Sequence, residues 1–315
     1  MTACRAIISL MTINSLLPNR PGLKILSFSL DFIRSFWGMK STYQLTIASL
    51  MLMAGLTFAG LRPAHAQAQS SGWLATFQNY KLSPKWGIYF DIQYRTTDQW
   101  KQMHSLLIRP GVNYYFKPNM IGTVGYAIIP QQRISGGVTG YLPEHRIWEQ
   151  FIVTHNARLS HKARNTGIQH RFRLEQRYIP KFHAAGNSLV HDKHVNVNRF
   201  RYFARAVIPI GGVHTVTAPP ADGSMASSAQ PGSAASRAFT SGFFAAIQNE
   251  IFLNIGDASP VNGKVFDQNR AYLAVGYRCS KQFDVEMGYL NQYINGAGRN
   301  STANHVLQVA TYVRL

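Results

Sequence analysis

The chain has 315 residues and a formal net charge of +19, yet charged residues make up only 14% of it. Ordinary soluble domains carry about 25%, so little charge is left for a conventional hydrated surface. The basicity alone would suggest nucleic acid as a partner. However, the arginines alternate along apolar segments instead of forming an exposed basic helix face, which argues against that class.

The N-terminal region predicts a secretory signal peptide over residues 39–66. Met39 and Lys40 begin a short positive region, and residues 45–61 are apolar and uncharged. The small residues Ala64 and Ala66 then precede a cleavage site after Ala66. A membrane anchor is the alternative, but the apolar stretch is short for a spanning helix. We interpret residues 1–38 as an upstream extension that is not native, with Met39 as the start and Gln67 as the first mature residue.

The mature chain would then run from residue 67 to residue 315, with 26 Lys and Arg and 12 Asp and Glu, a difference of +14. Cys279 is its only cysteine, so an intrachain disulfide is impossible. Residues 67–84 form an N-terminal segment in which residues 73–80 are a possible extra strand. Because Gln67 is not a cysteine, a lipoprotein anchor has no support.

From Lys85 onward, apolar and polar residues alternate with a period of two, which is the pattern of β-strands. No long stretch has apolar residues at helical spacing. Ten such segments begin near Lys85, His104, Met120, His145, Gly167, Val195, Ser241, Gln268, Gln282 and Ala303.

The polar face of these segments is rich in arginine. In residues 170–180, Arg171, Arg173 and Arg177 alternate with apolar residues, and the mature chain has 17 Arg against 9 Lys. The planar guanidinium group suits buried pairing with carboxylates better than lysine does. We therefore predict an interior network, with further carboxylates at Glu149, Asp284 and Glu286. Its core members are Glu144, Arg146, Arg171, Arg173, Glu175, Arg177, Arg199, Arg201, Glu250 and Arg270.

These features predict an all-β fold: a transmembrane antiparallel up-and-down β-barrel of ten strands over residues 85–315. A soluble two-sheet sandwich would also alternate. However, an arginine that faces hydrocarbon costs about 2–4 kcal/mol at mid-depth, so the arginines should line the lumen while Phe172 and Leu174 meet lipid.

The connections predict the topology of the barrel. Long loops at residues 131–144, 181–194 and 255–267 should face outward, and short turns and Leu315 the periplasm. The small-residue segment 218–236 is predicted to be a disordered loop on the periplasmic side. The strand count becomes twelve if that loop hides a hairpin or if residues 73–80 join the wall.

Two further patterns fit a small barrel. Glycines precede tyrosines at Gly125, Gly276 and Gly288, where a missing side chain would relieve crowding inside. Aromatic residues near strand ends predict interfacial girdles. These are Trp86, Tyr94, Trp100, Trp148, Tyr178 and Tyr293.

An ordered set of short blocks adds a resemblance to a known family. The blocks are "RPGVNYYF", "GYAIIP", "EHRIWEQF", "HRFRLEQR", "RFRYFARAVIP", "NEIFLN", "FDQNR" and "MGYLNQY". Over residues 73–315 the chain resembles the outer-membrane proteins grouped as domain of unknown function 2490. The resemblance implies an outer-membrane β-barrel and no established activity, ligand or cofactor.

The function is left open by the sequence. The network is interpreted as structural, with a narrow anion-selective pore as the alternative. An outer-rim hydrolase is a third hypothesis, resting on His183, His191, Asp192 and His194, although no serine motif accompanies them. Histidines three residues apart could also suggest a metal, but we predict no enzyme, metal or cofactor. The expected partners are outer-membrane lipid, the barrel assembly machinery and small anions, in a two-membrane bacterium.

Overall fold

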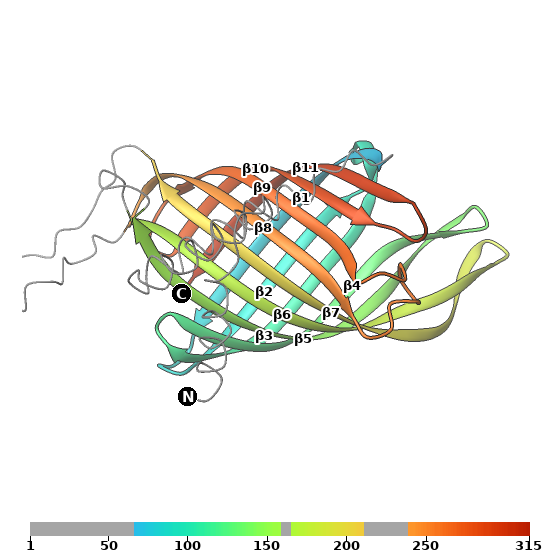
Figure 1. Ribbon diagram of the computed structural model, residues 1–315, viewed down its shortest axis with the longest axis horizontal. Coiled ribbons are helices and arrows are strands. Elements are labelled where there is room, and N and C mark those ends of the chain that lie inside the picture. Colours follow the sequence, from blue (N-terminus) through green and yellow to red (C-terminus); the bar gives the residue numbers. More distant parts are fainter. Residues whose placement is uncertain (1–65, 159–164, 211–238) are drawn as a thin grey trace, which may run out of the picture. The chain divides into compact units, whose positions relative to one another are not determined.

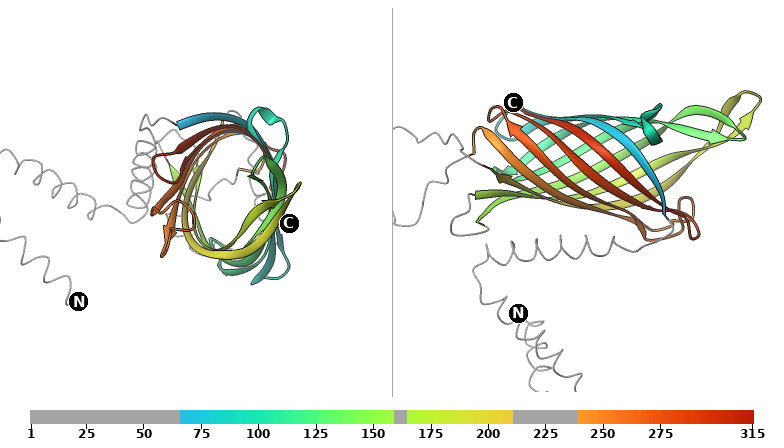
Figure 2. Two further views of the ribbon diagram at one scale, coloured as in Figure 1. Left: turned by 90° about the vertical axis from the view of Figure 1, so that its right-hand side faces the viewer. Right: turned by 90° about the horizontal axis from the view of Figure 1, so that it is seen from above.

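The computed structural model describes residues 66–158, 165–210 and 239–315, and these residues form a closed β-barrel (Figures 1 and 2). The predicted extension 1–38, residues 39–65 of the predicted signal peptide and the loop 218–236 lie outside this part of the chain. The strands are β1 (Ala66–Lys81), β2 (Trp86–Thr96), β3 (Met103–Lys117), β4 (Met120–Ser135), β5 (Val138–Arg158), β6 (Asn165–Ala185), β7 (Ser188–Pro209), β8 (Gly242–Ile255), β9 (Phe266–Arg278), β10 (Phe283–Asn295) and β11 (Ser301–Arg314).

The all-β barrel predicted from the sequence is confirmed, but the described residues form eleven strands instead of ten or twelve. The additional strand is β1, which pairs antiparallel with β2 and parallel with β11. An odd number of strands forces one parallel seam, because the first and last strands then run in the same direction. The chain therefore enters the barrel wall at the end where β10 turns into β11, and Leu315 lies at the opposite end.

Two of the predicted long loops are wrong, because residues 131–144 and 181–194 continue the strands into hairpins. Gly136 and Gly137 form the turn between β4 and β5 with φ angles of +55° and +78°. Gly186 lies in the turn between β6 and β7 with a φ angle of +58°. Glycine adopts this left-handed region without steric cost. The pairing of β5 with β6 begins only at His145, so both hairpins project beyond the rim at one end (Figure 1).

Side chains alternate between the lumen and the outside along each strand, as the period-two pattern predicts. In β9, Tyr272 and Ala274 are buried in the lumen, whereas Leu273 and Val275 are about 60% exposed on the outside. Among the described residues no helix is long or apolar enough to cross a membrane. The described chain also contains a short 3-10 helix, η2 (Asp98–Trp100), between β2 and β3.

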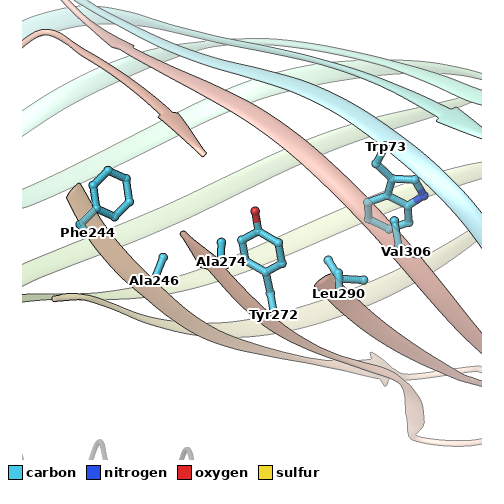
Figure 3. Packing of buried hydrophobic residues seen from close by; sticks show 7 residues of the cluster. All are labelled: Trp73, Phe244, Ala246, Tyr272, Ala274, Leu290 and Val306. Atoms are coloured by element: carbon cyan, nitrogen blue, oxygen red, sulfur yellow. The ribbon is translucent and has the colours of Figure 1, made fainter. Parts of the chain in front are cut away.

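The lumen holds two apolar clusters beside its polar groups. One lies on β1 and β8–β11 and contains Trp73, Phe244, Ala246, Tyr272, Ala274, Leu290 and Val306 (Figure 3). The other lies on β2–β5 and contains Tyr89, Leu107, Ala127, Ile129 and Trp148. A barrel of this size is thus filled by side chains instead of enclosing a wide channel.

Trp148 corrects one part of the predicted aromatic girdle. It is fully buried in the lumen, where a Cβ on Gly125 would come within 2.3 Å of its ring. The glycine is needed because the indole lies directly against the β4 backbone. Trp86 and Trp100 are about half exposed, as a girdle requires. Cys279 is exposed in the turn between β9 and β10.

Candidate functional site

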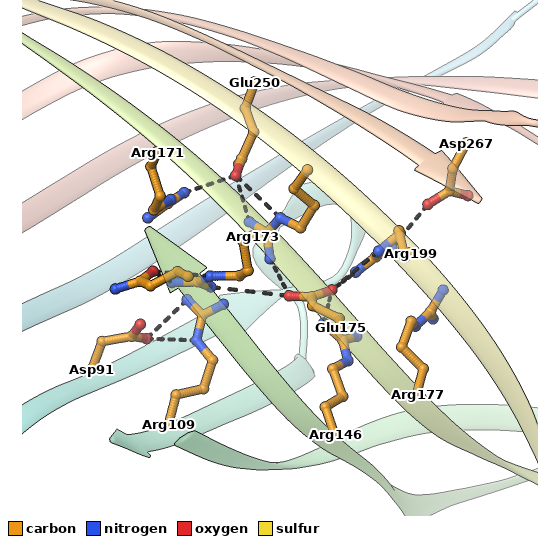
Figure 4. A network of polar contacts seen from close by, with 12 residues as sticks. Asp91, Arg109, Arg146, Arg171, Arg173, Glu175, Arg177, Arg199, Glu250 and Asp267 are labelled. Carbon is orange, nitrogen blue, oxygen red and sulfur yellow. Dashed lines mark hydrogen bonds and ion pairs between the residues drawn. The ribbon is translucent and has the colours of Figure 1, made fainter. Parts of the chain in front are cut away.

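The ten residues predicted as a charge network all lie on lumen-facing positions of β5–β9. Alternation places residues two apart on one face, so β6 alone supplies Arg171, Arg173, Glu175 and Arg177. Ion pairs join all ten into one connected set. Figure 4 shows the part of this set around Glu175 and Glu250. We refer to this set, together with Asp91, Arg109 and Asp267, as the septum.

Glu175 lies at the centre of the septum and is only 1% exposed. Its carboxylate accepts from Arg199 Nη2 at 2.7 Å and from Arg201 Nη1, and Arg146 Nη1 lies 3.5 Å away. Arg173 Nη1 is 4.0 Å from the same carboxylate. A carboxylate with four guanidinium neighbours from three strands fixes the register of those strands, since each group would be costly to bury alone.

Two further carboxylates, on β5 and β8, extend the network beyond Glu175. Glu144 accepts from Arg146 Nε and Arg177 Nε, both at 2.7 Å. Glu250 accepts from Arg171 Nη2 and Arg201 Nη2, also at 2.7 Å. These ion pairs therefore link four neighbouring strands, β5 to β8, on the lumen side of the wall.

Sequence reasoning missed two acidic members. Asp91 on β2 accepts from Arg109 Nε at 2.9 Å, and Asp267 on β9 accepts from Arg199 Nη1 at 2.8 Å. Asp91 already stood on the polar face of its segment, so period-two alternation could have found it. Asp267 stood at the edge of a predicted loop and gave no such signal.

Glu149 is a correction to the predicted interior carboxylates. It lies five positions after Glu144, an odd spacing that places it on the opposite face of β5. It is half-buried on the outside and accepts from Gln176 Nε2 at 3.1 Å. Asp284 and Glu286 do face the lumen, where Asp284 pairs with Arg278 at 2.8 Å and Glu286 pairs with Arg205.

Positive charge exceeds negative charge in and beside the septum. Ten arginines lie there, counting Arg95 and Arg133, against five carboxylates, a described excess of five positive charges. Arg95 forms no ion pair within the described residues. Several buried guanidinium nitrogens have no hydrogen-bond partner there, among them Nε of Arg95, Arg133, Arg171 and Arg270.

Cavities lie along the lumen of the described part of the barrel. A cavity of about 580 Å³, which we call the hairpin-end chamber, reaches the connections β2–β3 and β8–β9. A smaller cavity of about 200 Å³ follows, and another of about 660 Å³ lies toward the C-terminal end. Trp73, Arg109, Arg201 and Arg270 line both the first and the second cavity. The side chains of the septum thus stand between the chamber and the rest of the lumen.

The histidines of the rim-hydrolase hypothesis lie on the projecting part of β6 and β7. His183 Nδ1 is 2.7 Å from Asp192 Oδ1, and the rings of His191 and His194 are 4.3 Å apart. The hydrogen bonds of the described residues connect this group to no serine, threonine or cysteine. No set of three or more His, Cys, Asp or Glu in the described part of the chain is arranged to hold a metal.

The geometry defines the class as a closed β-barrel with a charged, partitioned lumen. The family described as "Protein of unknown function (DUF2490)" matches residues 70–222 and 229–303, and the chain belongs to this family, as its sequence blocks suggested. No curated protein matches the chain. Among solved structures, it is similar to the NanC porin in a rhombohedral crystal form, at 10% identity over 74% of this chain and 92% of that one, with a TM-score of 0.37. A similarity of that size carries no functional argument.

Proposed function

We propose that this protein is an outer-membrane β-barrel whose lumen is closed at rest by the septum. The observation that carries the proposal is the contrast between the two faces of β6. Phe172 and Leu174 are exposed on the outside, whereas Arg173 and Glu175, each of which follows one of them in the chain, are almost fully buried. Such a wall suits acyl chains outside and ion pairs within, because hydrocarbon penalises an exposed guanidinium group.

The strand lengths support the same proposal. A tilted strand crosses a bilayer with about 9–11 residues, and the barrel strands reach this length, from 11 residues in β2 to 22 in β7. In the proposed orientation, Leu315 and the short turns face the periplasm, and the β4–β5 and β6–β7 hairpins face outward. Outer-membrane lipid and the barrel assembly machinery are then the expected partners, reached after removal of the predicted signal peptide.

Fractionation and heat-modifiable migration test the membrane part of the proposal. The protein should remain in the outer-membrane fraction and migrate differently on a denaturing gel before and after boiling. A chain that stays in solution without detergent and migrates identically in both states would refute it.

Planar-bilayer recording tests the closed lumen. We expect no stable current from the wild type, since septum side chains separate the chamber from the other cavities. An anion-selective pore is the second candidate, favoured by the excess of arginine over carboxylate in the septum. Stable currents whose reversal potential shifts toward anion selectivity in a salt gradient would replace the first proposal with the second.

A further inference from the structure

We propose that the hairpin-end chamber binds a small oxyanion with carboxylate or phosphate groups, held by Arg95 and Arg270. The inference goes beyond the closed barrel proposed above, because it assigns a ligand site to one side of the septum. It concerns binding and does not depend on whether ions pass through the lumen.

Both arginines stack on the ring of Trp73, and each has an N–H donor without a hydrogen-bond partner among the described residues. Their guanidinium carbons lie 3.8 Å (Arg95) and 5.0 Å (Arg270) from the centre of the Trp73 ring. Arg95 donates to Gln93 at 2.6 Å and forms no ion pair within the described residues. Arg270 is 8% exposed, and its nearest carboxylate, Glu250, is 3.9 Å away. The Nε atoms of both are buried without a partner in the described structure.

The charge around the chamber points to an anionic occupant. The septum and its two neighbours carry five more positive than negative charges, and a buried charge is expensive unless it is paired. The carboxylates that line the chamber are already engaged. Asp267 accepts from Arg199 Nη1 at 2.8 Å, and Asp98 accepts from the Ser70 backbone N–H at 2.7 Å. An anion in the chamber would supply the missing negative charge.

The chemistry of the lining narrows the ligand class. The planar fork of guanidinium donors matches the paired oxygens of a carboxylate or a phosphate. Around the arginines stand carboxamide side chains, which can donate to and accept from hydroxyl groups. These are Gln69, Gln131, Gln132, Gln268, Gln292 and Asn304. A chamber of about 580 Å³ has room for a small hydroxylated carboxylate, for which citrate is a suitable probe.

Calorimetric titration of the folded protein in detergent tests the inference, with citrate and inorganic phosphate as separate probes. Ionic strength is held constant with chloride so that general screening is the same throughout. We expect saturable binding of at least one probe, weakened about tenfold to a hundredfold by Arg95→Gln and by Arg270→Gln. Arg299→Gln is the matched control, because it removes the same charge from the exposed β10–β11 connection, outside the chamber lining.

Two outcomes would overturn the proposal: no binding of either probe to the wild type, or an equal loss of binding in the Arg299→Gln control. Each variant is first checked for heat-modifiable migration. If one variant fails to fold, a second readout is the stabilisation that citrate gives against unfolding in urea. This stabilisation is then compared between the wild type and the variant that folds. Conductance of the same preparations separates the two proposals, since stable currents would refute the closed lumen while the titration still decides the site.

Discussion

Replacing Glu175 with glutamine tests whether the septum behaves as a buried ion network. The substitution preserves the shape of the side chain but removes the negative charge that Arg199, Arg201 and Arg146 share. Glu175 is 1% exposed and these arginines are buried too, so water cannot solvate the guanidinium groups that lose their counter-charge. Breaking a buried ion pair from one side costs about 3–5 kcal/mol, because the remaining charges stay buried without compensation. We expect a loss of unfolding free energy in that range.

Equilibrium unfolding by urea in lipid vesicles measures this loss, with tryptophan fluorescence and heat-modifiable migration as independent probes. Glu149→Gln is the matched control on the neighbouring strand, where the carboxylate lies on the outside and contacts Gln176. The control should lose no more than about 1 kcal/mol. A similar small loss for Glu175→Gln would show that its four guanidinium neighbours do not depend on it, and the reasoning would be wrong.

Three further predictions follow from particular contacts. Arg95→Gln should destabilise the barrel less than Glu175→Gln in the same urea titration, because Arg95 forms no ion pair in the described structure; a larger loss would contradict the charge count. Gly276→Ala should cost about 1–3 kcal/mol by overpacking, since its Cβ would meet the Phe244 ring at 2.3 Å. Adding Phe244→Ala should then destabilise less than the sum of the two single changes, and strict additivity would rule out the clash. A membrane-impermeant maleimide should label Cys279 in whole cells only after the outer membrane is permeabilised; labelling of intact cells would reverse the proposed orientation.

The barrel wall was largely predictable because alternation is a local property of the sequence. Each of the ten segments with a period of two became a strand, and the faces of Phe172 and Arg173 were assigned correctly. The sequence predicts only residues 73–80 as a possible strand, because the first half of β1, "AQAQSSG", contains no apolar residue larger than alanine. Its place is fixed by pairing with β11, more than 200 residues away, and such long-range pairing leaves no local signal in the sequence.

The septum was predictable as a set of residue types but not as a set of pairs. Alternation places Glu175 in the lumen, yet its partners depend on the register of β5, β6 and β7, which alternation alone does not specify. The same limit explains why Trp148 was predicted in the aromatic girdle and not in the lumen. Its parity indicated the lumen, but the room for its ring comes from Gly125 on the neighbouring strand. Glu149 was assigned to the interior against its own parity, an error that the alternation rule would have prevented.

Site-directed labelling with a lipid-soluble thiol probe tests the central claim most directly. Single cysteines are placed outside at Phe172 and Val275 and inside at Ala246 and Ala274, in a Cys279→Ser background without residues 1–66. We expect rapid labelling at the two outer positions and protection at the two inner ones, which are almost fully buried in the lumen. Protection of the outer pair with labelling of the inner pair would place the arginine-bearing face against lipid, and the account would be wrong.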